Sequence, residues 1–311
     1  MTFSLLARDP ATGQLGVASQ SHYFGVGSVV TWAEAGVGVI ATQAFADRSY
    51  GPKGLALLRA GRSAGEALAL SLDADPDREV RQVTYLDASG NIGIHSGNRC
   101  VAEAGMAVRD HAAAIGNALD NDAVLDAMLS GYRDAAGDLA HRLVAGLRSA
   151  DNAGGDIRGS QSAALLVVDG RRTEAPWNGI VRDLRVDDHA DPIGELARLA
   201  DLNDGFDLIS RVVFDPHGPV LAASPSDPEF AVAANALADA QAALGANQEA
   251  RFWSAVLHAR WGRSAEARRL LAAATQSNPR LPRFVARLAD AGILTPQDVA
   301  SLAPELPSVP L

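Results

Sequence analysis

The order of the predicted strands and helices restricts the fold of this chain more than any other feature of its sequence. Strands predicted at 3–8 and 15–20 flank a turn-forming segment at 9–13, and Gly-rich apolar strands at 25–32 and 37–43 follow directly. Strands that arrive consecutively cannot form a doubly wound parallel sheet, because parallel neighbours need a crossover helix between them. The chain is therefore predicted to begin with antiparallel strands.

Helices are predicted in pairs after the groups of strands. The later elements are helices at 50–60 and 63–72, strands at 80–86 and 91–95, a weaker apolar stretch at 112–119, helices at 123–135 and 139–148, strands at 162–168 and 180–186, and a helix near 192–200. Neither Gly-rich strand has the polar face of a solvent-exposed sheet. Two antiparallel sheets packed face to face, each covered by a helical pair, account for both observations. We expect an α+β fold, specifically a four-layer αββα sandwich.

The composition changes after the last of these elements. Several turn-forming dipeptides that end in Pro come next, and an Ala- and Arg-rich helical stretch follows. We expect a main domain at 1–205, a linker at 206–228 and a small all-α domain at 229–311. Residues 253–279 resemble one tetratricopeptide-type helix pair, and a generic helical hairpin fits the same pattern.

Charge and composition exclude several functional classes. The formal net charge of −10 repels phosphate backbones and no basic stripe offsets it, so nucleic acid is not an expected partner. No apolar run approaches the roughly 20 residues of a membrane-spanning helix. The first residues have no basic start, and Asp9 and Pro10 interrupt their apolar run, which is not typical of a signal peptide. A lone Cys100 fits a reducing compartment, so we expect a cytoplasmic protein.

Thr2 is the first candidate for catalysis. Removal of the initiator methionine would give it a free α-amine beside its hydroxyl, and an amine of ordinary pKa, about 7.7 to 8.0, is well suited to act as a general base. The β-branched side chain restricts χ1 and holds the hydroxyl near the amine. If Arg8 pairs with Gln14 in the first hairpin, Thr2 lies beside Ser19 or Gln20, inside a sheet.

Two other groups offer competing chemistry. Cys100 follows His95 closely and could act as a thiolate nucleophile, although a lone cysteine is more often a small buried residue. The triplet Asp187, Asp188 and His189 cannot present all three side chains to one metal ion, because adjacent strand residues point to opposite faces. We therefore expect no metal and no other cofactor.

The Gly-rich loop at 154–161 is the last candidate. Its glycines allow close approach of the backbone to a ligand, while Asp156, Arg158 and Gln161 supply an anionic acceptor, a forked donor and an amide. Its spacing matches neither a P-loop nor a dinucleotide-binding loop. A substrate-binding loop and an ordinary surface turn both fit this sequence.

Several short motifs occur together in the main domain. They are TFS at 2–4, ARD at 7–9, LGVA at 15–18, VGSVV at 26–30, GVG at 36–38, ATQAFA at 41–46, YGP at 50–52, GN at 116–117, GGD at 154–156, GSQSAA at 159–164 and DLRVDDH at 183–189. With these motifs, about residues 1–205 resemble the domain-of-unknown-function 1028 family, which is grouped with the N-terminal-nucleophile (Ntn) hydrolase superfamily. The resemblance implies the αββα fold and Thr2 as nucleophile, and it names no substrate. The C-terminal part resembles a module described as peptidoglycan-binding.

The sequence departs from proteasome-type members of that superfamily. Those relatives carry an Asp on the second strand and a catalytic Lys in the segment that follows, whereas Ser19 and apolar residues stand near these positions here. The α-amine of Thr2 is therefore expected to act with hydrogen-bonding groups only.

We hypothesise an amidohydrolase that acts on a linear amide in a small polar molecule. Thr2, exposed by removal of Met1, would form an acyl-enzyme ester, Ser19 would orient the amine, and Gln43 or Asn117 would stabilise the oxyanion. The loop residues Asp156, Arg158 and Gln161 would bind the substrate.

Three alternatives remain open on the sequence alone. The chain fits a non-catalytic binding or scaffold protein on a degenerate Ntn-hydrolase fold, a thiol enzyme that uses Cys100, or a protein that cleaves itself at an internal Thr or Ser. Exposed helical layers are compatible with a homo-oligomer, but no heptad pattern specifies a number of subunits.

Overall fold

The computed structural model of the 311-residue chain describes residues 2–215, 218–220 and 227–304. The chain divides into two compact units, one up to Ala200 and one from Asp201. The boundary lies within helix α5 (Pro192–Ile209). The expected α+β fold, with two antiparallel sheets and a C-terminal helical region, is confirmed.

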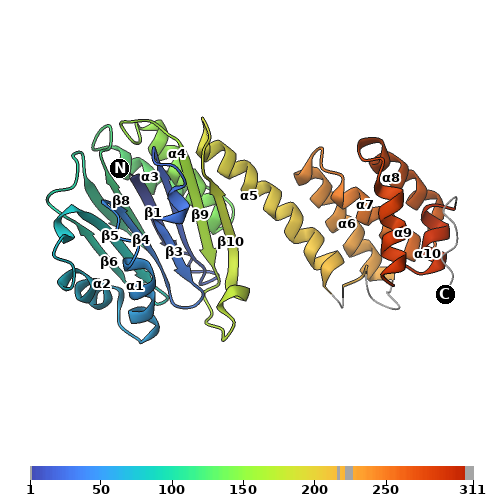
Figure 1. The fold of residues 1–311 in the computed structure, drawn as a ribbon, viewed down its shortest axis with the longest axis horizontal. Helices are drawn as coiled ribbons and strands as arrows, with labels where there is room; N and C mark the ends of the chain where they lie inside the picture. Colours follow the sequence, from blue (N-terminus) through green and yellow to red (C-terminus); the bar gives the residue numbers. More distant parts are fainter. Residues whose placement is uncertain (1, 216–217, 221–226, 305–311) are drawn as a thin grey trace. The chain divides into compact units, whose positions relative to one another are not determined.

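The first unit contains two antiparallel sheets (Figure 1). The six-stranded sheet has the order β10 (Ile180–Val186), β9 (Ser162–Val168), β2 (Leu15–Ser21), β1 (Thr2–Arg8), β8 (Ala112–Asn117) and β7 (Gly105–Arg109). The four-stranded sheet has the order β3 (Thr31–Glu34), β4 (Gly38–Ala44), β5 (Arg81–Asp87) and β6 (Ile92–Ser96). Strand β1 is thus an interior strand with a hydrogen-bonded neighbour on both edges.

Each sheet carries a pair of helices, which Figure 1 shows on opposite sides of the strands. Helices α1 (Tyr50–Arg59) and α2 (Ala64–Asp73) pack on the four-stranded sheet, and α3 (Val124–Asp134) and α4 (Leu139–Asn152) pack on the six-stranded sheet. Ser63 and Glu66 form a capping box at the start of α2. The faces of the sheets that lack helices pack together through a third apolar cluster.

The two faces of β1 have different partners, because successive strand side chains point in opposite directions. Phe3 and Leu5 belong to the core shared with α3 and α4. Leu6 belongs to the cluster between the sheets. Thr2 and Ser4 share the face of Leu6 and lie at the opposite end of the strand from Arg8, so the space between the sheets is polar at one end and apolar at the other.

The register of the first hairpin differs from our expectation by one residue. Arg8 pairs with Leu15 rather than Gln14, and Thr2 consequently pairs with Ser21 rather than Ser19 or Gln20. The loop contains one residue more than expected, because Gly13 adopts a left-handed conformation (φ 76°) and Asp9 N–H donates to the Gln14 carbonyl.

Two further elements of the first unit differ from the sequence-based expectation. The strand expected at 25–32 is replaced by a short 3-10 helix (Val26–Ser28) before β3, because Gly25 turns the chain with a positive φ of 64°. Strand β7 was not expected, since its sequence GMAVR does not alternate apolar with polar residues and its outward side chains, Met106 and Val108, are apolar but exposed.

The second unit is helical in its described part. Its helices are α6 (Asp227–Leu244), α7 (Glu249–Arg260), α8 (Ser264–Ser277), α9 (Leu281–Asp290) and α10 (Pro296–Leu302). Residues 206–214, which we assigned to the linker, are helical and continue α5 into a π-helical turn (Ser210–Phe214), because Ile209 and Val213 are buried in this unit's core. Parts of the expected linker, 216–217 and 221–226, lie outside the described residues. Within the described ranges no helix has the length and apolarity that crossing a bilayer requires.

Leu143 gives a direct test of the packing between α4 and the six-stranded sheet. It is fully buried in that core. We expect Leu143→Ala to lower the free energy of unfolding of the first unit by about 2 to 5 kcal/mol, because the lost side chain leaves a cavity. Leu70→Ala, on the exposed face of α2, is the control and should change it by less than about 0.5 kcal/mol. Urea denaturation of both variants measures the two free energies of unfolding. Equal losses of stability in the two variants would contradict the packing of α4 against the six-stranded sheet.

Candidate functional site

Thr2 lines a cavity of about 260 Å³ at the polar end of the space between the sheets. The lining residues are Thr2, Tyr23, Val26, Val29, Val30, Gln43, Ala44, Ala46, Arg48 and Arg158. They come from both sheets and from loops that are distant in sequence. The hydroxyl-bearing residue at the start of β1 therefore borders a space that can hold a small molecule.

Thr2 itself is held from three directions. It is only 4% exposed, and its Oγ1 donates to Ser21 Oγ at 3.1 Å. Its carbonyl oxygen accepts from Gln43 Nε2 at 3.0 Å and from Asn117 Nδ2 at 3.4 Å. Gln43 lies on the opposite sheet, whereas Asn117 is the cross-strand partner of Thr2 on β8. The structure thus brings Thr2, Gln43 and Asn117 together.

Gln82 ties these amides into one network between the sheets. Its Oε1 accepts from Gln43 Nε2 at 2.9 Å and from Asn117 Nδ2 at 2.8 Å. Its Nε2 donates to the Gly116 carbonyl at 2.7 Å. Sequence analysis missed Gln82, because its strand RQVTYLD carries several other polar residues and Gln82 does not stand out among them. The side-chain N–H groups of Gln43 and of Asn117 therefore already donate to oxygen atoms of the protein.

Asn117 keeps one unused polar atom. Its Oδ1 is buried and has no hydrogen-bond partner among the residues that the structure describes. A buried acceptor without a partner is unfavourable, so such an atom indicates a donor that joins it in the functional state.

Ser19 occupies a different place from the one that we expected. Its hydroxyl lies 2.7 Å from Ser4 Oγ, and Ser4 also donates to Gln43 Oε1 at 2.6 Å. The residue directly opposite Thr2 is Ser21, because the hairpin register is shifted. Ser19 therefore reaches the site only through Ser4 and Gln43. Thr2 and Ser4 lie two residues apart on β1, as do Ser19 and Ser21 on β2, so these hydroxyls share one face of the sheet.

The backbone is strained directly after two of the residues that hold Thr2. Ala44 follows Gln43 with φ 67°, and Ala118 follows Asn117 with φ 47°. Left-handed conformations are uncommon for residues with a Cβ atom and collect at functional sites. Both strands leave their sheets at the edge of the polar network.

The loop expected to bind substrate contributes one side chain to the cavity. Arg158 lines it and donates to Asp156 through Nε at 3.1 Å and through a terminal nitrogen at 2.9 Å. The buried Asp156 carboxylate also accepts from His22 N–H at 3.3 Å. Gln161 is directed elsewhere, because its Nε2 donates to Asp188 at 3.3 Å. Asp156 therefore fixes Arg158, and Gln161 is not a lining residue.

Arg48 is a lining residue that sequence analysis missed. It is exposed, and its guanidinium forms no hydrogen bond or ion pair with the described part of the chain. Arginines are so frequent in this sequence that nothing distinguishes Arg48 before the fold is known.

The competing candidates have little chemical support from their surroundings. Burial raises the pKa of the Cys100 thiol, whose Sγ lies 3.4 Å from the Arg81 carbonyl. His95 contacts the Arg78 carbonyl instead, at 2.9 Å. His189 Nδ1 accepts from the Asp191 backbone at 3.0 Å. Across the described ranges no three His, Cys, Asp or Glu side chains are grouped to hold a metal ion.

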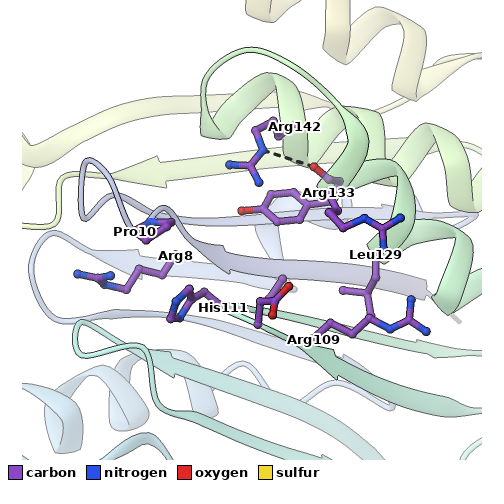
Figure 2. A pocket seen from close by; sticks show the side chains of 10 residues that line it. Arg8, Pro10, Arg109, His111, Leu129, Arg133 and Arg142 are labelled. Carbon is purple, nitrogen blue, oxygen red and sulfur yellow. Dashed lines mark hydrogen bonds between the residues drawn. The ribbon is translucent and has the colours of Figure 1, made fainter.

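A second cavity, of about 230 Å³, lies near the far end of β1 (Figure 2). Four arginines line it, but Arg109 is paired with Asp126 at 2.8 Å and Arg133 with Asp134 at 2.7 Å. Figure 2 shows the side chains of Arg8 and Arg109 pointing in opposite directions. Because these charged groups do not point toward one common position, this cavity is a weaker candidate for a ligand-binding site than the cavity at Thr2.

Comparisons with known proteins identify the family of this chain. A family model described as "Family of unknown function (DUF1028)" matches residues 2–196. The crystal structure of protein SPO2555 from Silicibacter pomeroyi, assigned to the same family model, is 31% identical, with a TM-score of 0.58, and the match covers 67% of this chain and 86% of that chain. No curated protein matches the chain. The expected family resemblance is confirmed, and the chain belongs to the DUF1028 family, whose function is unknown.

Proposed function

We propose that the protein is an Ntn-type amidohydrolase on a four-layer αββα sandwich, with Thr2 as its nucleophile. The position of Thr2 is the observation that carries the proposal. It is the first residue of an interior strand, its side chain borders a cavity, and its carbonyl is fixed by Gln43 and Asn117. A residue so placed can combine a nucleophile and a general base once it becomes the N-terminus.

Removal of Met1 is the step that would create the base. Met1 itself lies outside the described residues. A small second residue such as Thr2 is compatible with its removal, and the new α-amine would be a hydrogen-bond donor close to the cross-strand partner Asn117. We assign the unpartnered Asn117 Oδ1 as the acceptor for this amine. Asn117 thereby replaces Ser19 as the group that orients the base.

The reaction would proceed in two balanced steps. The α-amine takes the proton of Thr2 Oγ1, which attacks the amide carbon. The C–N bond breaks, the leaving nitrogen receives the proton, and an ester links the acyl group to Oγ1. Water then attacks this ester, giving its proton to the amine, and Thr2 recovers its proton when the carboxylic acid leaves. No cofactor is consumed in this sequence.

The contacts favour positioning roles for the two amides. The N–H groups of Gln43 and Asn117 donate to protein oxygens, which leaves none for a developing oxyanion. Arg158 is the cavity-lining donor that is held most firmly, through Asp156. We therefore assign Arg158 to the substrate, where its charge can also stabilise the tetrahedral intermediate.

Replacement of Thr2 separates this proposal from its rivals. Alanine and serine are both small enough to keep methionine removal, so each variant exposes residue 2. We expect Thr2→Ala to lower turnover of a linear amide by at least about 10³-fold, because the nucleophile is lost, and Thr2→Ser to retain measurable turnover. A panel of linear amides analysed by mass spectrometry supplies the substrate.

Cys100→Ser is the control for the competing nucleophile. It should keep turnover within about twofold, since burial raises the pKa of the Cys100 thiol and disfavours its thiolate. Full activity of Thr2→Ala, with inactive Cys100→Ser, would reverse the assignment.

The pH dependence of kcat/KM tests the base. The amine acts only when neutral, so activity should rise with pH and level off above the amine pKa. An α-amine ordinarily has a pKa of about 7.7 to 8.0, so the midpoint is expected near pH 8. Thr2→Ser should show nearly the same midpoint, since it keeps the amine. A midpoint above about pH 9 would contradict an amine base and would match a thiol of raised pKa.

A further inference from the structure

The cavity at Thr2 has two chemically different walls. Arg48 and Arg158 supply guanidinium groups, while Val26, Val29 and Val30, which lie within one five-residue segment, supply apolar surface. A cavity of about 260 Å³ is below the roughly 300 to 1,000 Å³ typical of sites for drug-sized ligands. The ligand is therefore small and has both a polar and an apolar part.

The two arginines differ in whether a carboxylate neutralises their charge. Arg158 is matched by the buried carboxylate of Asp156, so this pair adds no net charge to the cavity. Arg48 has no partner within the described ranges and leaves one positive charge at the wall. On a chain of net charge −10, an unmatched guanidinium beside a reactive hydroxyl is suited to one anionic group of a ligand.

Exposed apolar side chains accompany the lining residues. Tyr23 lines the cavity and is 56% exposed, and Phe24 follows it with 63% of its surface exposed. Phe45, between the lining residues Ala44 and Ala46, is also 63% exposed. Large apolar side chains left in water around a cavity indicate a binding surface.

We propose that the substrate is an amide of an apolar α-amino acid with a free carboxylate, such as an N-acyl amino acid. Arg48 binds the carboxylate, the valine wall and Tyr23 receive the side chain, and the amide carbon faces Thr2 Oγ1. Cleavage of this molecule rests on the proposed function, whereas its binding does not. Hydrolysis would yield the acid of the acyl group and a free amino acid.

Binding to the inactive Thr2→Ala variant tests the substrate class without turnover. Titration calorimetry compares N-acetyl-L-valine, N-acetyl-L-leucine and N-acetyl-L-phenylalanine with their uncharged carboxamides and with N-acetylglycine. We expect at least one acid to bind about 5- to 10-fold more tightly than its carboxamide, and more tightly than N-acetylglycine. Added salt should reduce the preference for the acid, because Arg48 is exposed.

Two substitutions show whether Arg48 causes the preference. Arg48→Gln in the same background should abolish it, and Arg62→Gln, which removes the same charge from an exposed loop residue outside the cavity lining, should leave it intact. Equal affinity for acids and carboxamides, or no binding of any panel member at millimolar concentration, would overturn the inference. An equal effect of both substitutions would overturn it as well.

The wild-type protein separates this inference from the proposed function. Arg48-dependent binding without hydrolysis of the panel would support the substrate class and contradict Thr2 as a nucleophile. Hydrolysis of uncharged amides that is indifferent to Arg48→Gln would support the nucleophile and overturn the substrate class.

Discussion

The pairing of β1 on both edges is the constraint on which the rest of the site depends. Strand β2 fixes the register that sets Thr2 opposite Ser21, and β8 sets Thr2 opposite Asn117. The apolar side chains of β1 then anchor one face to α3 and α4 and the other to the opposite sheet. A residue at the start of such a strand has almost no freedom, which is what a reacting group needs.

The polar layer around Thr2 is neutral, and this limits its chemistry. Ser4, Ser21, Gln43, Gln82 and Asn117 supply hydrogen bonds but no group that titrates near neutral pH. Positive charge enters only at the cavity wall, through arginines. The base of the proposed mechanism is therefore the α-amine of Thr2 and not a side chain of this layer, whereas proteasome-type sites use acidic and lysine side chains.

Sequence patterns predicted the parts of the fold that depend on local periodicity. The first hairpin, the capped helix α2 and most later strands follow from alternation and capping. The exact register of the first hairpin could not be predicted in this way. One left-handed residue, Gly13, lengthens its loop, so that Ser21 rather than Ser19 lies opposite Thr2. Gln82 and Arg48 reach the site only through tertiary packing, so no local pattern marks them. Thr2, Gln43 and Asn117 were identifiable through family motifs that the fold brings together.

The central claim is that Thr2 acts as the N-terminal residue of the mature chain. The intact mass of the purified native protein, combined with N-terminal sequencing, measures this directly. The account predicts a single chain that lacks Met1 and begins at Thr2, with no internal cleavage. A chain that retains Met1 would contradict it, because an acylated nitrogen at Thr2 cannot accept the proton of its own hydroxyl, and a binding protein on the same fold would then become the leading interpretation.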